Sequence, residues 1–296
     1  SAPLATLAAA RDRARRHLRD GAHAQVVLHE GYHRLAETLV LGPEDSGAEE
    51  APVVWRGGKN VFVGSGVPIS GWQQLKEDPP NLAAAARGKL WVADLPAGTP
   101  RITTLYQNLQ RLPRARSRNF NPVQEPDNGP PELNRYPNAP DVRPDVVYLP
   151  PEMIGAWDNL DDVELFVRPK YGWICNFLTF AKLDRSSGRA VTTVPATYPM
   201  TCEITHLEGT EDRPCWLENY LEVLDQPGEW VYDGAARRLY LWPSNGTPGD
   251  DIRYPALSEL VRIEGNEASG SFPRHLHLEE ITFMHGARET LAADDA

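Results

Sequence analysis

The sequence is poor in cysteine, in basic residues and in long apolar runs. Its three cysteines, Cys175, Cys202 and Cys215, share no close spacing in 296 residues, so they predict neither a disulfide framework nor a zinc knuckle. A Cys202 to Cys215 bridge and buried free thiols remain the two alternatives. The formal net charge of -11 provides no basic footprint for nucleic acid. No apolar run approaches the length of about 20 residues that crosses a bilayer. We therefore expect a soluble chain with neither nucleic acid nor membrane as a partner.

Turn-forming residues are plentiful, since 27 prolines and 23 glycines punctuate the chain. This composition favours many short strands over long helices. Residues 4–20 carry the one convincing helix pattern, with apolar side chains near a 3.6-residue period and Gly21 as a stop signal. Short extended runs follow it up to NVFVGSG, and similar runs return near the end as LVRIEG (260–265) and HLHLEEITFMHG (275–286). The two ends of the chain therefore share one pattern.

The middle of the chain, about residues 67–258, alternates apolar and polar residues between long loops. Strands are expected at DVELFVRP (162–169), GRAVTTVP (188–195) and GEWVYDGAARRLYLWP (228–243). In the last of these, Asp233-Gly234 between apolar runs is a strong hairpin signal. The middle is expected to be antiparallel.

These patterns predict a mainly β right-handed parallel β-helix with an N-terminal capping helix and a large antiparallel β-rich insertion. The first coil would need a lid, and residues 4–20 would supply it. The predicted parts are the capping helix and first coils in 1–66, the insertion in 67–258, and the resumed β-helix in 259–296. A β-sandwich is the competing interpretation.

His29-Glu30-Gly31-Tyr32-His33 matches the H-E-x-x-H pattern of zinc proteases, which requires both histidines on one helix face. The valines before it favour a strand, and Gly31 costs about 1 kcal/mol inside a helix. The extended metzincin pattern fails, because Ala36 replaces its glycine. A strand that ends in a glycine turn, with surface histidines, is the preferred interpretation, and no metal or cofactor is predicted.

Two stretches, RITTLYQNLQRLPRARSRNFNP (101–122) and WLENYLEVLDQPGEWVYDGAARRLYLWP (216–243), resemble secreted β-helical carbohydrate enzymes of glycoside hydrolase family 141 and its relatives. The similar sequence motifs are Arg114-Ala115-Arg116 with Asn119, then Glu218-Asn219, then Leu224-Asp225 with Pro227-Gly228-Glu229-Trp230, and the closing L-Y-x-W-P of the hairpin. The turn at Gly31 and the run Ile281-Thr282-Phe283 are similar to coil positions of the same family.

The resemblance implies a polysaccharide-degrading glycoside hydrolase that is secreted or periplasmic and acts on a polysaccharide or oligosaccharide. The alanine- and arginine-rich composition fits a bacterial source. In such enzymes the catalytic carboxylates are expected on later coils, so this chain resembles an N-terminal part and its own catalytic residues stay unknown. A further β-helix segment is then expected to stack on residues 275–296.

Several residues are candidates for substrate binding. Carboxylates Glu218, Asp225 and Glu229 lie close in sequence to aromatic rings that are able to stack on sugars, namely Trp216, Tyr220, Trp230 and Trp242. The predicted substrate-binding set is Arg114, Arg116, Glu218, Asn219, Glu229, Trp230 and His285. For the arginines, anchoring of the insertion by a carboxylate is the competing role. For the hairpin, the alternative is that Trp230 packs it and Glu229 accepts backbone hydrogen bonds.

Two other functions stay open. A glycan-binding or adhesin module would use the aromatic rings without chemistry. A polysaccharide lyase would need a base and usually a cation beside a uronate, and Asp158, Asp161 and Asp162 in WDNLDD are the acidic candidates for such a cation site.

Overall fold

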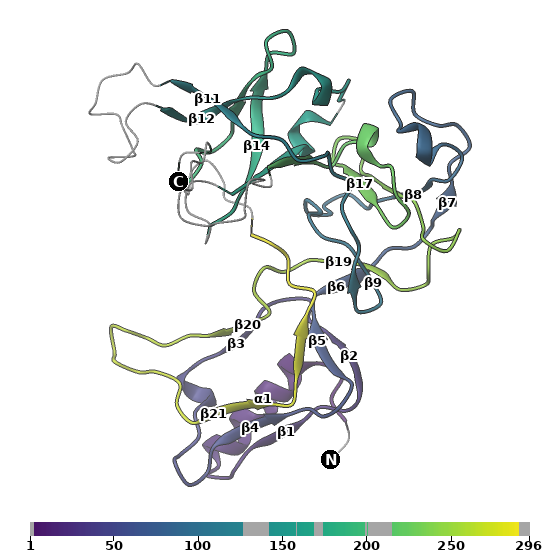
Figure 1. The fold of residues 1–296 in the computed structure, drawn as a ribbon. Coiled ribbons are helices and arrows are strands. Elements are labelled where there is room, and N and C mark those ends of the chain that lie inside the picture. The colour runs from purple at the N-terminus through teal and green to yellow at the C-terminus, as the bar shows by residue number, and fades with distance from the viewer. Residues whose placement is uncertain are drawn as a thin grey trace, which may run out of the picture. The chain divides into compact units, whose positions relative to one another are not determined.

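The computed structural model describes residues 3–126, 142–157, 159–168, 174–198, 200 and 215–289 (Figure 1). The chain forms two compact units, each assembled from segments that are not consecutive. Unit 1 comprises Ser1–Ile69, Ile102–Arg111 and Asp251–Glu289, and unit 2 comprises Ser70–Arg101, Leu112–Asp250 and Thr290–Ala296. The predicted boundaries after residues 66 and 258 stay a prediction.

Unit 1 contains the α-helix α1, which spans Leu7–Arg19, and a set of short strands. Its 3-10 turn η1 is Pro43–Asp45. The strands are β1 Gln25–Val27, β2 Gly31–Arg34, β3 Leu39–Leu41, β4 Val53–Arg56, β5 Val61–Gly64, β6 Gly66–Pro68, β9 Tyr106–Gln107, β10 Gln110–Arg111, β19 Ile252–Pro255, β20 Val261–Ile263, β21 Leu276–Glu279 and β22 Thr282–Met284.

Helix α1 confirms the helix that was predicted over residues 4–20. Thr6 caps it, because its hydroxyl accepts a hydrogen bond from the Ala9 N–H at 3.1 Å. Leu7 and Ala14 are buried against the core of unit 1, which also contains Trp55. Within the described ranges, no helix is long and apolar enough to span a membrane.

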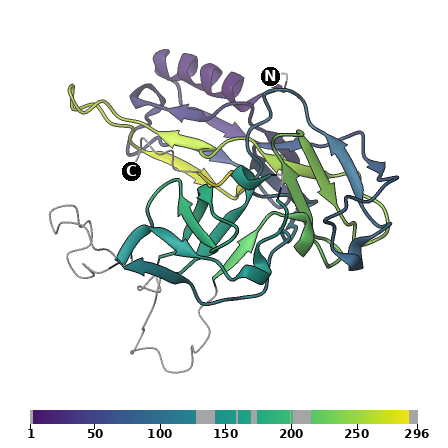
Figure 2. The ribbon, with the colours of Figure 1, turned by 90° about the horizontal axis from the view of Figure 1, so that it is seen from above.

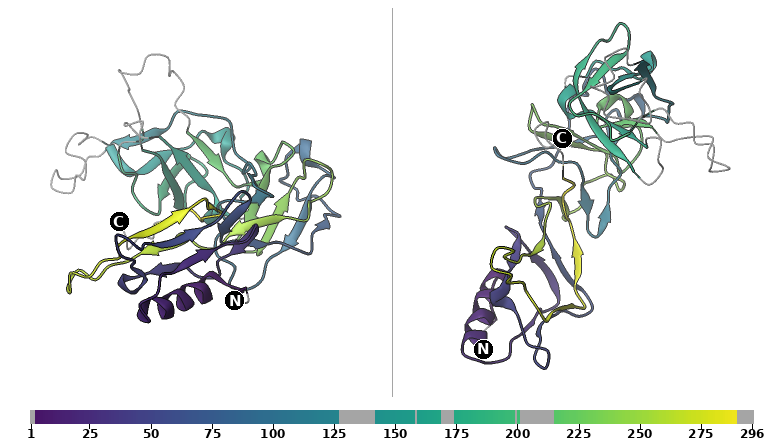
Figure 3. Two further views of the ribbon diagram at one scale, coloured as in Figure 1. Left: turned by 90° about the horizontal axis from the view of Figure 1, so that it is seen from below. Right: turned by 90° about the vertical axis from the view of Figure 1, so that its left-hand side faces the viewer.

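Strands from the N-terminal part of the chain pair in unit 1 with strands from residues 261–284. Parallel pairing gives the strand orders β1-β4-β21, β2-β5-β22 and β20-β3. Helix α1 lies along the β1 side of these strands, and β21 and β22 lie on the opposite side, as Figures 2 and 3 show. The remaining sheet of unit 1, β10-β9-β19-β6, is antiparallel.

Unit 2 is built from antiparallel sheets. Its six-stranded sheet has the order β11-β12-β15-β14-β13-β16, and its four-stranded sheet the order β17-β18-β8-β7. The strands are β7 Gln73–Gln74, β8 Trp91–Asp94, β11 Val123–Pro126, β12 Val142–Tyr148, β13 Glu164–Val167, β14 Asn176–Leu183, β15 Arg189–Thr192, β16 Trp216–Glu218, β17 Trp230–Asp233 and β18 Arg238–Leu241. The 3-10 turns are η2 Ala84–Ala86, η4 Pro151–Met153, η5 Leu160–Asp162 and η6 Leu221–Val223.

The hairpin predicted at Asp233-Gly234 is confirmed, because β17 pairs with β18 from Trp230 opposite Leu241 to Asp233 opposite Arg238. One face of the six-stranded sheet packs a core around Leu165, Leu178 and Leu217. The alternate residues of the same strands, such as Glu164 and Glu218, therefore point to the other face.

The predicted fold class, a right-handed parallel β-helix, is wrong. Antiparallel pairing builds every sheet of unit 2 and one sheet of unit 1 in the described part of the chain. Parallel sheets number three there, each of at most three short strands, beside an isolated parallel bridge between Arg114 and Trp230. Such shallow sheets do not provide the repeated stacking of coils that a solenoid needs for stability.

Candidate functional site

Arg114 is the centre of a buried group of charges in unit 2. Its side chain is 2% exposed, and its Nη1 pairs with the carboxylate of Glu164 and lies 3.5 Å from Glu218 Oε2. Glu164 on β13 and Glu218 on β16 stand directly opposite each other in the sheet. Arg101 approaches from another side, with its Nη2 3.7 Å from Glu164 Oε1. Arg114 therefore neutralises two carboxylates that the sheet forces together, which is the anchoring role considered from the sequence.

Arg116 lies on the surface at the end of a ladder of rings. Its guanidinium is 4.1 Å from the centroid of the Trp216 ring, which stacks on Phe166 at 3.9 Å with an interplanar angle of 17°. Phe166 in turn meets the edge of Phe177 at 5.1 Å. The indole Nε1 of Trp216 donates a hydrogen bond to Glu218 Oε1 at 2.7 Å. This indole therefore links the exposed arginine to the buried charge cluster.

Asn219 joins the six-stranded sheet to the hairpin. It is fully buried and has a positive φ of 72°, a conformation that asparagine tolerates better than most residues. Its Nδ2 donates hydrogen bonds to the carbonyls of Asp162 and Tyr232, at 3.1 and 2.8 Å, and its Oδ1 accepts one from Tyr232 N–H at 2.8 Å. All its side-chain atoms are therefore occupied by backbone groups.

Trp230 and Glu229 occupy the start of the hairpin. Trp230 is fully buried, and its Nε1 donates to the Leu112 carbonyl at 3.3 Å. Glu229 Oε2 accepts hydrogen bonds from Asp225 N–H and Gln226 N–H at 2.9 and 3.0 Å. Burial raises the pKa of Glu229, and the two backbone donors together with Arg116 oppose that rise. Both residues thus make the packing and turn contacts that the alternative interpretation assigned to them.

His285 belongs to unit 1, whereas the other six candidates belong to unit 2. It is 3% exposed, and its Nδ1 is 2.9 Å from the hydroxyl of Tyr32. That hydroxyl accepts a hydrogen bond from Gly66 N–H at 2.7 Å, which leaves its proton for the imidazole. The ring of Tyr106 packs on His285 at 4.6 Å. Burial, followed by Arg253, lowers the pKa of His285, against the opposing effects of the Asn108 backbone and Asp251.

The zinc-protease interpretation of His29 and His33 is wrong, because His33 lies on strand β2 and His29 in the turn before it. His33 Nε2 donates a hydrogen bond to the carbonyl of His29 at 2.7 Å instead of facing an ion. Across the described ranges, no three histidine, cysteine or acidic side chains gather as a metal-binding group.

Two residues considered from the sequence, Asp158 and Cys202, lie outside the described residues. The carboxylate of Asp162, from the same acidic run as Asp158, accepts a hydrogen bond from Gly234 N–H at 2.6 Å. Cys215 is a buried free thiol, and burial raises its pKa.

Sequence reasoning missed Glu164, Phe166 and Phe177. Glu164 and Phe166 alternate on β13, within a run that was recognised as a strand, and Phe177 lies opposite Phe166 on β14. The alternation places the first two on one face. It carries no information on which distant strands supply their partners.

The accessible chemistry of this cluster is that of Arg116. Glu164 is 1% exposed and tied to Arg114, and Glu229 is held by backbone N–H groups, so neither presents a carboxylate to a ligand. In the part of the chain that the structure describes, no carboxylate lies within ion-pair distance of the Arg116 guanidinium. An exposed guanidinium held over an indole is suited to binding hydroxyl or carboxylate groups in a plane.

Comparison with known proteins supplies a likeness of fold. No protein-family model and no curated protein matches the chain. A solved structure described as "Glycoside hydrolase" superimposes with a TM-score of 0.70 at 23% sequence identity, and the match covers 97% of this chain and 48% of that one. The chain has a glycoside hydrolase-like fold. It spans about half the length of that structure.

Proposed function

We propose that the chain is the N-terminal part of a polysaccharide-degrading glycoside hydrolase related to family 141, of bacterial origin and secreted or periplasmic. The observation that carries the proposal is the likeness in fold to a structure described as "Glycoside hydrolase" over 97% of the chain. The sequence motifs around Arg114 and Trp230 support the proposal, because they resemble motifs of that family. The catalytic carboxylates are then C-terminal to these residues.

In this proposal, the buried charge cluster around Arg114 and the packed aromatic rings of Trp216, Phe166 and Phe177 have different roles. Arg114, Asn219, Glu229 and Trp230 hold the sheet and the hairpin, because they are buried and their polar atoms bind protein groups. Arg116 contacts the saccharide, because its guanidinium is exposed and Trp216 holds it from below. Glu218 serves this contact indirectly by fixing the indole.

The test compares Arg116→Gln with Arg118→Gln in the longest natural chain that contains these residues. Arg118 is a matched control, since it lies two residues away, is 68% exposed and pairs with the exposed Glu152 at 2.6 Å. With aryl glycosides and pectic oligosaccharides, Arg116→Gln is expected to raise KM several-fold and Arg118→Gln to leave it unchanged. An absence of turnover on every glycan would refute the hydrolase, and equal effects of the two substitutions would refute the role of Arg116.

A partner segment is part of the proposal. Strands β20, β21 and β22 are edge strands of their sheets, and apolar side chains are exposed on and beside them, including Ile263, Phe272, Leu278 and Phe283. Exposed edges and apolar patches of this kind are usually covered. We propose that a further β-rich segment stacks on residues 275–296, of which 290–296 lie outside the described residues.

Hydrogen exchange tests this segment directly. The amides of β21 and β22 are expected to exchange more slowly in a chain that continues past Ala296 than in residues 1–296 alone. Equal exchange in both chains would exclude the stacking while leaving the proposed hydrolysis untouched.

A glycan-binding module without chemistry is the second candidate. It is favoured by the carboxylates of the cluster, because Arg114 or backbone groups already bind Glu164, Glu218 and Glu229. Glycan binding that depends on Arg116, with no turnover in the complete protein, would select this function over hydrolysis.

A further inference from the structure

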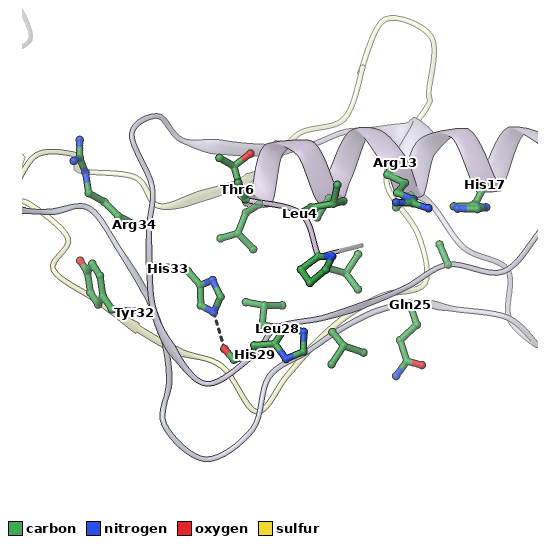
Figure 4. A pocket seen from close by; sticks show the side chains of 18 of the residues that line it. Leu4, Thr6, Arg13, His17, Gln25, Leu28, His29, Tyr32, His33 and Arg34 are labelled. Carbon is green, nitrogen blue, oxygen red and sulfur yellow. Dashed lines mark hydrogen bonds between the residues drawn. The ribbon is translucent and has the colours of Figure 1, made fainter. Parts of the chain in front are cut away.

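Two depressions of unit 1 differ in their linings. The one beside helix α1 has a volume of about 670 Å³, and polar side chains such as His29 and His33 share its walls with apolar ones (Figure 4). The other has a volume of about 480 Å³ and is lined by the segment that carries β20 and by the strands β21 and β22. We call it the end pocket. Five of its seven lining residues are apolar, namely Leu260, Val261, Ile263, Leu278 and Phe283.

The end pocket is bordered by free strand edges. Among the described strands, β20 pairs with β3, β21 with β4 and β22 with β5, and none pairs with the opposite edge of these three. In the sheets β1-β4-β21 and β2-β5-β22, each strand adds to the one that precedes it in chain order. A free edge is a template for a further strand. The order of the strands therefore points to a segment that follows β22 in the chain as the occupant.

Residues 264–275, which connect β20 to β21, form an arm that extends past the strands of unit 1, as Figures 2 and 3 show in yellow-green. The two sides of the arm are paired, because Asn266 N–H donates to the Ser271 carbonyl at 2.6 Å and Ser271 N–H donates to the Asn266 carbonyl at 3.0 Å. Asn266 Oδ1 also accepts a hydrogen bond from Ser269 N–H at 3.1 Å. These bonds lie within the arm, so its shape does not depend on a partner.

The base of the arm is fixed to the N-terminal part of unit 1. Arg274 N–H donates to Ser46 Oγ at 3.0 Å, and the Arg274 carbonyl accepts a hydrogen bond from Gly47 N–H at 3.0 Å. Phe272 packs on Gly265, where a Cβ would collide with the phenyl ring, and yet it is 49% exposed. A preformed arm that presents an aromatic ring to solvent avoids much of the conformational entropy that docking otherwise costs.

We propose that the arm and the end pocket together clasp the segment that follows this chain, with Phe272 packed against that segment and one of its apolar side chains in the end pocket. The inference rests on the proposed function, which places a further β-rich segment on residues 275–296, and it identifies the residues that hold that segment. The matched structure supports this occupant, because about half of it lies outside the match. The pocket suits an apolar side chain, since the charged residue of its described lining, Glu259, already pairs with Arg262 at 2.6 Å.

The test compares side-chain labelling by hydroxyl radicals, read by mass spectrometry, in residues 1–296 and in the complete natural chain. Phe272, Ile263 and Phe283 are exposed in this chain, and each is expected to be labelled several-fold less in the complete one. Leu109 is the matched control for Ile263, because it lies in unit 1 outside the arm and the end pocket, and the two are 56% and 55% exposed. Its labelling is expected to be the same in both chains.

Substitution of Phe272 tests the arm by a second measurement, hydrogen exchange at the β21 and β22 amides. In the complete chain, Phe272→Ser is expected to speed this exchange about tenfold or more, which is what burial of such a side chain is worth. Phe272→Leu keeps an apolar contact and is expected to restore most of the protection. In residues 1–296 alone, Phe272→Ser and Leu109→Ser are expected to change exchange less than about twofold, as exposed substitutions generally do.

Several outcomes would overturn the clasp. Protection of Phe283 with equal labelling of Phe272 in both chains would remove the arm and leave the stacking, whereas labelling of both rings as in residues 1–296 would remove the stacking as well. Protection that already appears in residues 1–296 and is lost on dilution would make a second copy of the chain the occupant. Equal protection of Leu109 would make the effect unspecific. Turnover of glycans by the complete chain is measured separately, so its absence refutes the hydrolase without altering these results.

Discussion

Replacement of Arg114 by methionine tests whether the buried charge cluster holds unit 2 together. Arg114→Met keeps the length of the side chain but leaves Glu164, whose side chain is 2% exposed, without its principal cation. Removal of one partner from a buried ion pair costs about 3–5 kcal/mol. The expected loss is about 3 kcal/mol, at the low end of that range, because Arg101 stays 3.7 Å from Glu164.

A double-mutant cycle separates the uncompensated charge from lost packing. Arg114→Met/Glu164→Gln removes both charges, so we expect it to be more stable than Arg114→Met by about 1–2 kcal/mol. Stability is measured by urea unfolding with hydrogen exchange at the β13 and β16 amides, because a global signal would mix two units. A loss below about 1 kcal/mol in Arg114→Met, or no recovery in the double variant, would refute the reasoning.

Three further predictions concern buried polar groups. Asn219→Ala is expected to cost about 1–3 kcal/mol in urea unfolding, because the buried Tyr232 N–H loses its acceptor, while the carbonyls of Asp162 and Tyr232 keep donors in Arg101 and Asn159. Asn219→Asp is expected to cost more, because it buries a charge and sets a carboxylate oxygen against those two carbonyls. Because folding lowers the pKa of His285 from 6.5, stability is expected to fall as pH drops below that value, and His285→Gln removes this part of the dependence of Tm on pH. Because burial raises the pKa of Glu229 above 4.5, the ionised form opposes folding, so Glu229→Gln gains stability over the unmodified chain as pH rises from 4 to 7 in parallel denaturant titrations.

Local elements could be predicted from the sequence because their signals are local. The apolar period and stop signal placed a helix over residues 4–20, and the structure has Leu7–Arg19. Asp233-Gly234 between apolar runs placed the hairpin of β17 and β18. In both cases the residues that determine the element lie within it or directly beside it in the sequence.

Pairing between distant strands could not be predicted in the same way. Alternation in DVELFVRP shows that Glu164 and Phe166 share a face, but not that Glu218 and Trp216 lie opposite them, 54 and 50 residues later. Strand runs at the two ends of the chain were recognised and the middle was expected to be antiparallel, but the sequence did not reveal that the terminal runs form parallel sheets of only two or three strands. The error in fold class therefore arose from taking similar strand runs at the two ends as evidence for a stack of repeated coils.

Arg114 and Arg116 belong to one R-A-R motif, but the fold places them in different environments. Spacing of two places Arg114 and Arg116 on one side of an extended segment, and both were candidates for anchoring or for an acidic sugar. Isolated β-bridges pair the backbone of Arg114 with Trp230 and that of Arg116 with Glu218. The guanidinium of Arg114 contacts Glu164 and Glu218, whereas that of Arg116 lies over the Trp216 ring. Carboxylates converge on Arg114 because Glu164 and Glu218 are opposed across two strands, and like charges so close require a cation between them. Because Arg114 meets that requirement, Arg116 is not needed for it, and its exposed guanidinium is available for the saccharide contact that we propose.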